Sequence, residues 1–340
     1  MRPERTAKRY LLPAAALIAL LAGLTLGSVG FAPKDLFAIL SHKLFGAPLP
    51  EAVRPISVSI LWTIRFPRAV MAFLVGASLA ASGTVMQSVL RNPLASSYTL
   101  GVSSGASLLA AIVMVSGFRL PLVGPYTLAL FGFLGGFGTV FLAIALALRF
   151  SHTLENQTVI LVGMVLSLFV NALLTLVTAL SDERLSQLVF WQMGSFSAQT
   201  WENAGVTLPI LLLSLVIFAH FGDEMDLMSF GQEQALSAGV DIRRVKLILL
   251  AVAALLTGAA VSFVGIIGFI DLIAPHIVRR FFGARHRLIV PLSALMGGGF
   301  MVACDLIGRT VIAPQELPVG AVSALVGAPF FVYLYFRKER

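Results

Sequence analysis

Long apolar segments dominate the sequence and exclude a water-soluble fold. A membrane-spanning helix needs about 20 mostly apolar residues, and we locate ten segments of about that length. Of the 340 residues, 58% are hydrophobic and 12% charged, with a mean hydropathy of +0.93, whereas a soluble domain carries about 25% charged residues. The sequence therefore predicts an all-α polytopic membrane protein, folded as a single domain over residues 1–340. Its ten predicted spans are residues 10–31, 66–90, 99–117, 122–148, 158–180, 204–221, 246–264, 265–284, 288–308 and 318–336.

The distribution of basic residues predicts the orientation of these spans. Arg2, Arg5, Lys8 and Arg9 precede the first span, which lacks the small-residue cleavage pattern of a signal peptide. With a cytoplasmic amino terminus, most of the 24 Lys and Arg residues fall on the cytoplasmic side, as the positive-inside rule requires. We therefore expect both termini in the cytoplasm, and we attribute the net charge of +8 to orientation rather than to nucleic-acid binding.

The composition also restricts the chemistry of this chain. Its single cysteine, Cys304, lies in an apolar run, and its five histidines are scattered. The sequence contains neither an H-x-x-x-H pair nor the G-x-x-x-x-G-K-S/T phosphate loop. We therefore expect no metal site and no cofactor bound by this chain, so that any nucleotide would be bound by a partner.

A weak internal repeat relates two parts of the chain. Because the matched spans are an odd number of spans apart, they must cross the membrane in opposite directions. Inverted repeats of this kind are typical of alternating-access transporters, and the repeat halves extend over about 66–180 and 246–336. The matches at an offset of 182 residues are Gly76 with Gly258, Ala77 with Ala259, Gly83 with Gly265, Pro93 with Pro275, and Gly101 with Gly283.

Three connections between spans are long enough to form structure of their own. Residues 32–65 are expected outside as a short lid or an amphipathic helix. Residues 181–202 are also expected outside, with Trp191 and Trp201 at the membrane interface. The charged segment 223–246 is expected in the cytoplasm. Its sequence GQEQALSAGVDIRRV predicts a short helix ended by Gly239 and a second helix capped by Asp241.

Several motifs, in order and spacing, closely resemble the permeases of ABC importers for iron siderophores and vitamin B12, the FecCD/BtuC-type or type II importers. The resemblance implies a permease that dimerises with a copy or a paralogue and performs no chemistry itself. It also implies two ATPase subunits that use ATP and Mg, an extracytoplasmic substrate-binding protein, and the plasma (inner) membrane of a prokaryote. The motifs are RFPRAVMAFLVGASLAASGTVMQSVLRNPLASSYTLGVSSGA (65–106), WQMGS (191–195), GQEQALSAGV (231–240), FVGIIGFIDLIAPHIVR (263–279) and ELPVGAVSALVGAPFFVYL (316–334).

Three arginines are expected at the outer mouth, where the orientation bias disfavours them. Arg65 and Arg68 open the second span and Arg309 ends the ninth. By resemblance, they form ion pairs with acidic residues of the binding protein. The alternative is that they only extend to the lipid headgroups.

The resemblance also assigns the cytoplasmic sites. Asn156 and Gln157, at the start of the fifth span, match the positions that close the inner gate, although they could simply begin a helix. Contact with the ATPase is expected within segment 223–246, which would otherwise be a solvated loop. The expected coupling residues are Glu233, Ala235, Ala238, Gly239, Val240 and Arg244.

Four polar residues inside the predicted spans need partners in the bilayer. They are Asp271, Asp305, Asn171 and Gln87. Arg309 follows Asp305 by four residues, so we expect an ion pair on one helix face. Asp271 departs from the family pattern, which usually has a small residue there.

The predicted function is therefore the permease subunit of an ABC importer that translocates a ferric siderophore into the cytoplasm, with cobalamin or haem as alternative cargo. Two other classes of protein are alternatives. An ion-coupled secondary carrier also uses inverted repeats but needs no cytoplasmic helix pair. An intramembrane serine hydrolase is suggested only by the G-x-S-x-G pattern of residues 101–105 together with His276.

Overall fold

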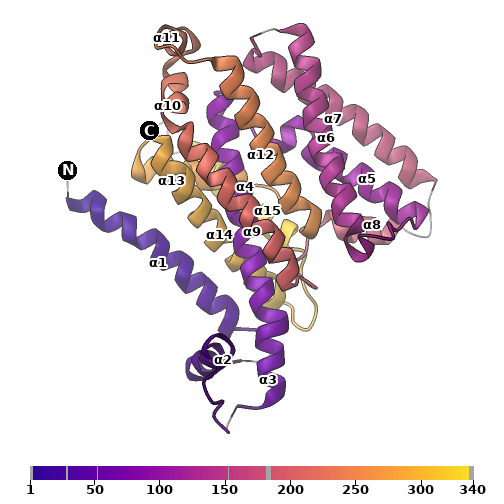
Figure 1. Ribbon diagram of the computed structural model, residues 1–340, viewed down its shortest axis with the longest axis vertical. Helices are drawn as coiled ribbons and strands as arrows, with labels where there is room; N and C mark the ends of the chain where they lie inside the picture. Colours follow the sequence, from indigo (N-terminus) through magenta and orange to yellow (C-terminus); the bar gives the residue numbers. More distant parts are fainter. Residues whose placement is uncertain (1–2, 28–29, 52, 152, 181–184, 337–340) are drawn as a thin grey trace.

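The computed structural model describes residues 3–27, 30–51, 53–151, 153–180 and 185–336, and within them it is helical with no strand (Figure 1). The basic residues Arg2, Arg337, Lys338 and Arg340 lie outside this part. The helices are α1 (Pro3–Thr25), α2 (Pro33–Phe45), α3 (Pro55–Ser59), a π-helical stretch (Ile60–Arg65), α4 (Phe66–Val89), α5 (Val102–Ser116), α6 (Thr127–Phe150), α7 (Asn156–Ala179), α8 (Leu185–Gln192), α9 (Trp201–His220), α10 (Gly222–Phe230), α11 (Gln232–Ser237), α12 (Ile242–Val264), α13 (Ile270–Phe282), α14 (His286–Thr310) and α15 (Val319–Phe336).

Each of the ten predicted spans corresponds to a helix, namely α1, α4, α5, α6, α7, α9, α12, α13, α14 or α15. Six helical stretches among the described residues are long and apolar enough to cross a membrane. The prediction for 265–284 is wrong in one respect, because helix forms only from Ile270 onward. Gly265 and Phe269 both have positive φ, which interrupts the helix between α12 and α13. The 13 residues of α13 extend only about 20 Å at 1.5 Å per residue, so this segment is a broken span.

The second span begins earlier than predicted. Helix is continuous over the 35 residues from Pro55 to Val89, whereas the sequence predicted an external connection over residues 32–65. Pro55 occupies the first helical turn, where proline is favoured because its missing N–H would have no helical partner. The remainder of that connection contains α2, which confirms a short helix there.

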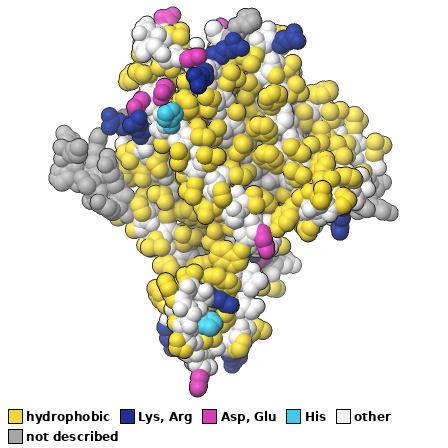
Figure 2. Space-filling view, viewed as in Figure 1, with side chains coloured by type: hydrophobic (Ala, Val, Ile, Leu, Met, Phe, Trp, Pro, Cys, Tyr) yellow, Lys and Arg dark blue, Asp and Glu magenta, His cyan; other side chains and the backbone are white. Residues whose placement is uncertain are grey.

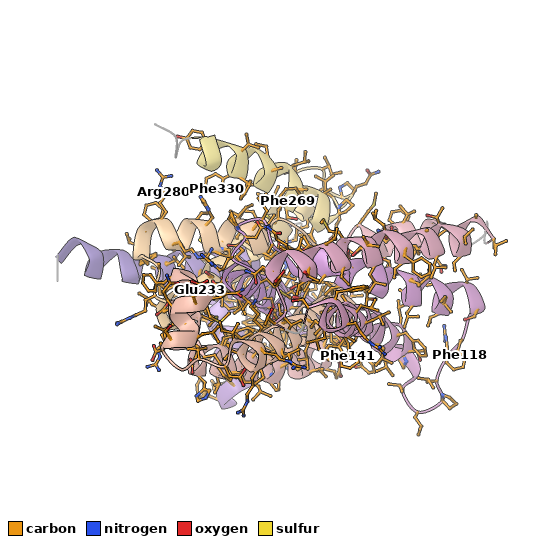
Figure 3. The ribbon with its side chains drawn as sticks, turned by 90° about the horizontal axis from the view of Figure 1, so that it is seen from above. Phe118, Phe141, Glu233, Phe269, Arg280 and Phe330 are labelled. Atoms are coloured by element: carbon orange, nitrogen blue, oxygen red, sulfur yellow. The ribbon has the colours of Figure 1, made fainter. Side chains whose placement is uncertain are left out.

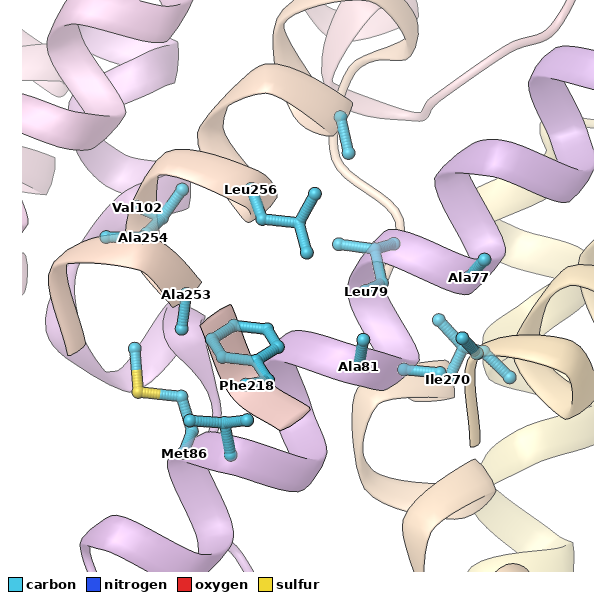
Figure 4. Close-up of a cluster of buried hydrophobic side chains, with 14 of the residues drawn as sticks. Ala77, Leu79, Ala81, Met86, Val102, Phe218, Ala253, Ala254, Leu256 and Ile270 are labelled. Carbon is cyan, nitrogen blue, oxygen red and sulfur yellow. The ribbon is translucent and has the colours of Figure 1, made fainter. Parts of the chain in front are cut away.

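Helix α4 forms the centre of the bundle and packs against α14, α12 and α13. Small residues allow these close approaches. A Cβ on Gly76 would collide with the carbonyl oxygen of Gly297, and one on Gly83 would collide with that of Asp271. Figure 4 shows the neighbouring core, in which α4 side chains face Leu256 of α12 and Phe218 of α9.

The two ends of the bundle differ in composition from its middle. Hydrophobic side chains cover most of the visible face, and most charged side chains lie toward its two ends (Figure 2). Helices α10 and α11 define one end, here called the α11 end, and α2 lies at the opposite end, here called the α2 end (Figure 1). The beginning of α1 and the end of α15 lie in the half that carries α11. Helices α4 and α12 run in opposite directions, as the proposed inverted repeat requires.

Candidate functional site: the two ends of the bundle

An ion cluster at the α2 end joins α4, α14 and the loop that precedes α15. Arg68 Nη2 donates to Asp305 Oδ1 at 2.8 Å, and Arg68 Nη1 donates to Glu316 Oε1 at 2.8 Å. Asp305 is 4% exposed and Glu316 42% exposed. The hydrogen bonds from Arg68 hold the pKa of Glu316 below its ordinary value.

The other two arginines assigned to docking lie beside this cluster. Arg65 is 5% exposed and donates to the carbonyl of Leu24 at 3.1 Å, while its guanidinium lies 4.8 Å from the centre of the Phe31 ring. Arg309 donates to the carbonyl of Gly23. The structure therefore brings the three arginines to one end of the bundle, but buries most of their surface against α1 and the ion cluster.

The ion pair expected between Asp305 and Arg309 is present at 3.7 Å, but it is the weaker of two. The principal partner of Asp305 is Arg68, 237 positions away in the sequence, which holds both carboxylate oxygens. The apolar pattern of the span showed that Asp305 needs a partner, but it could not show that this partner, Arg68, lies on another helix.

The remaining polar residues of the spans differ in their surroundings. Asp271 is buried and accepts a hydrogen bond from the hydroxyl of Ser96. Gln87 donates to the backbone carbonyl of Asp271 at 3.2 Å and accepts from Arg279 at 2.6 Å. Asn171 is exposed on α7. Asp271 and Gln87 therefore brace the contact between α4 and α13.

The charged segment 223–246 forms the helices expected of it at the α11 end. Helix α11 spans Gln232–Ser237 and is followed by Gly239 with φ +85°. The carboxylate of Asp241 caps α12 by accepting from the backbone N–H of Arg244 at 3.0 Å. The sequence did not separate α10, which precedes α11.

The six predicted coupling residues divide between two environments. Ala235 and Val240 are buried and anchor α11, whereas the other four are exposed, namely Glu233, Ala238, Gly239 and Arg244. Figure 3 views this end of the molecule and labels Glu233 on α11. The exposed surface therefore combines two charged side chains with an open glycine turn, where a Cβ on Gly239 would meet no other atom within 4 Å.

A partly buried hydrogen-bond chain attaches α10 to the membrane helices. Asp226 Oδ1 accepts from the backbone N–H of His286 at 2.9 Å and lies 2.6 Å from Nδ1 of its ring. Nε2 of the same ring lies 2.5 Å from Ser88 Oγ, which also accepts from Arg279 at 3.0 Å. No sequence pattern indicated this chain, because its partners come from α10, α14, α4 and α13.

The two residues assigned to the inner gate begin α7. Lys246 Nζ donates to Asn156 Oδ1 at 2.7 Å, so Asn156 is already engaged. Gln157 is exposed and lines a groove of about 920 Å³ between α6 and α7 with Glu155 and apolar side chains such as Leu161. Their placement at a helix start is confirmed, and a gating role stays a prediction.

The residues that suggested a serine hydrolase lie in helices. The serine of the G-x-S-x-G pattern, Ser103, is half-buried in the first turn of α5. The ring of His276 packs 6.1 Å from that of Phe331. Ser103 therefore lies at a helix start, and His276 takes part in aromatic packing between α13 and α15.

An apolar helix bundle with charged ends defines a multi-pass membrane protein. Residues 15–337 match the model of the FecCD transport family, and the chain belongs to that family. It is 36% identical over 323 residues to the uncharacterized ABC transporter permease protein YvrB of Bacillus subtilis, covering 95% of this chain and 91% of that protein. It is 38% identical to the cobalamin import system permease protein BtuC of Halobacterium salinarum, covering 87% and 78%. A solved inward-facing conformation of a putative metal-chelate type ABC transporter superposes with a TM-score of 0.84 at 29% identity, covering 96% and 98%.

Proposed function

We propose that this ABC transporter permease is the membrane subunit of an importer that carries a ferric siderophore into the cytoplasm. The observation that supports this most strongly is the α10–α11 pair, which presents charged and open backbone surface at one end of an otherwise apolar bundle. A permease that is driven by ATP but has no phosphate-binding loop of its own needs a partner that binds the nucleotide, and an exposed helix pair suits such a contact. Two ATPase subunits, which use ATP and Mg, would bind this surface.

The proposed assembly contains two permease chains, two ATPase subunits and an extracytoplasmic binding protein in a prokaryotic plasma membrane. The α11 end would face the cytoplasm together with both termini, and the α2 end would face the binding protein. ATP binding would move α10 and α11, and that motion would change which side of the path between the permeases is open. The permease itself performs no ATP hydrolysis in this mechanism.

Reconstitution tests the proposal directly. The permease, its cognate ATPase and its binding protein are placed in proteoliposomes, and uptake of a radiolabelled ferric siderophore is measured. We expect uptake that requires both ATP and the binding protein. Uptake that proceeds without ATP and follows a proton or sodium gradient would instead identify an ion-coupled carrier.

The cargo is the finer part of the proposal. Iron chelates are expected from the family resemblance, but the Halobacterium relative is named for cobalamin, so cobalamin and haem are tested beside the siderophore. Calorimetry on the cognate binding protein distinguishes them, because that subunit selects the ligand in this scheme. Tight binding of a ferric siderophore supports the proposal. If the binding protein binds only cobalamin or haem, that ligand is the cargo and the siderophore assignment is wrong.

Docking of the binding protein is assigned to Arg65, Arg68 and Arg309. Because Glu316 already accepts hydrogen bonds from both Nη atoms of Arg68, a carboxylate of the binding protein would have to compete with Glu316 for them. Glu316→Gln should therefore strengthen binding-protein stimulation of ATP hydrolysis at low salt. Stimulation that is unchanged by Glu316→Gln at both low and high salt would contradict a docking role for Arg68.

A further inference from the structure

Lys246 is a fully buried lysine whose partners are neutral. Its exposed fraction is 0%, which is rare for lysine unless the charge is paired. The ammonium group donates to the backbone carbonyl of Leu154 and to the side-chain oxygen of Asn156, both at 2.7 Å. Among the described residues, no carboxylate lies within ion-pair distance of it. Two short hydrogen bonds from a cation thus hold one particular turn of backbone and one particular side chain.

Lys246 lies between the coupling segment and the start of α7. It lies in the first turns of α12, directly after the exposed Gly239 turn and the Asp241 cap of segment 223–246. Its two partners lie where α6 gives way to α7: Leu154 is buried with φ +53°, and Asn156 begins α7. One side chain therefore connects the end of the coupling segment to the start of the helix that carries the gate residues.

Few other contacts make this connection. Helix α7 packs mainly on α5 and α6, whereas α12 packs mainly on α4, α6 and α9. A displacement of the first turn of α12 would otherwise reach α7 mainly by indirect routes, through α5, α6 or the short 3₁₀ helix at Ser97–Leu100. The hydrogen bonds of a buried charge are stronger than those between neutral groups. The start of α7 should therefore follow the first turn of α12 when that turn moves away as well as when it moves closer.

We propose that Lys246 is a positioning residue that transmits movement of the ATPase-contacting segment to the gate through Asn156. This inference rests on the proposed function, since it presupposes that force enters at α10 and α11, and on the predicted gating role of Asn156 and Gln157. The competing explanation is that Lys246 only stabilises the turn between α6 and α7. That explanation predicts a loss of stability without a change in how much uptake each ATP supports.

The test measures uptake per ATP hydrolysed in proteoliposomes that contain the complete transporter. Lys246→Met keeps an unbranched apolar stem as far as Cε and removes the donor, and Asn156→Ala removes one acceptor. Each should lower uptake per ATP about tenfold, which lies within the usual range of coupling between sites. The double variant should be no worse than either single variant, because both interrupt one link. Arg149→Met, which removes an exposed cation at the end of α6, should leave the ratio unchanged.

Each outcome decides the inference. Wild-type uptake per ATP in Lys246→Met, or defects that multiply in the double variant, would overturn it, even if the thermal unfolding temperature falls. Should Lys246→Met not fold, Asn156→Ala carries the same test, and a wild-type ratio there overturns the inference. Failure of the wild-type complex to couple uptake to ATP would instead refute the proposed function, and the inference with it.

Discussion

The two ends of the bundle use their charged residues in opposite ways. At the α2 end, Arg68, Asp305 and Glu316 satisfy one another, and Asp305 is 4% exposed. At the α11 end, charged side chains such as Glu233 and Arg244 are exposed, and only a few buried polar groups connect them to the membrane helices. At the α2 end the charged side chains pair mainly with one another, whereas at the α11 end several of them are exposed.

This difference has a physical consequence for alternating access. Breaking a buried ion pair leaves an uncompensated charge and is costly, so the α2 end should hold α4 and α14 together firmly. Exposed charges cost little to rearrange, so the α11 end can bind and release a partner. Substitutions at the two ends test this contrast, beginning with the one that should have the largest effect.

Removal of Asp305 should cause the largest loss of stability. Asp305→Ala leaves the Arg68 guanidinium largely buried and without its main partner, so we expect a loss of about 3–5 kcal/mol in the free energy of unfolding. The measurement is denaturant unfolding in mixed detergent micelles. A loss under about 1 kcal/mol would contradict the view that this pair holds the α2 end.

Removal of His286 should have the next largest effect. His286→Ala breaks the bonds to Asp226 and Ser88 and leaves both without that partner, so we expect a loss of about 1.5–3 kcal/mol. Faster hydrogen exchange in α10 should accompany it. The matched control is His220→Ala, an exposed histidine at the end of α9, and equal effects of the two substitutions would show that α10 is not anchored through His286.

The exposed ion pair at the α11 end should contribute little. Arg287 Nη2 lies 2.8 Å from Asp223 Oδ2, but the two side chains are 58% and 62% exposed. Arg287→Ala should therefore cost less than about 1 kcal/mol, and high salt should remove even that. An effect comparable with that of Asp305→Ala would eliminate the proposed contrast between the ends.

Acid pH should weaken the α2 end slightly through Glu316. The pKa of Glu316 is lower in the folded protein than its ordinary value of 4.5. Its contribution to the free energy of unfolding is therefore complete above about pH 4.5 and is lost as the pH falls through the pKa in the folded protein. The stability difference between wild type and Glu316→Gln should be constant near neutral pH and shrink under acid conditions. A difference that grows on acidification would reverse the assigned direction.

Local features of the fold were predictable from the sequence, and contacts between distant segments were not. Hydropathy located a helix for each of the ten predicted spans. Gly239 marked the end of α11 and Asp241 the start of α12, because these signals depend on neighbouring residues. The early start at Pro55 was missed because Arg65 and Arg68 were taken to mark the outer end of the second span, although residues 55–64 carry no charge. The break at Phe269 was missed because a non-glycine residue with positive φ leaves no mark in composition.

The candidate sites show the same division. The α11 surface and the start of α7 follow from motif order and from capping residues. The pairing of Arg68 with Asp305, the attachment of Asp226 to His286, and the burial of Lys246 each join helices far apart in the chain. A pattern that reads one helix at a time cannot assign such partners.

The central claim, that the ATPase binds the α11 end, is tested most directly by crosslinking from two matched glycines. Gly239 and Gly46 are both exposed, both follow a helix with positive φ (+85° and +70°), and a Cβ at either position would meet no other atom within 4 Å. A cysteine is placed at each position in an otherwise cysteine-free transporter and treated with a short reagent that joins a thiol to a lysine amine of the neighbouring chain. The account predicts a crosslink to the ATPase from Gly239→Cys and none from Gly46→Cys. A crosslink only from Gly46→Cys, or from neither position, would contradict it.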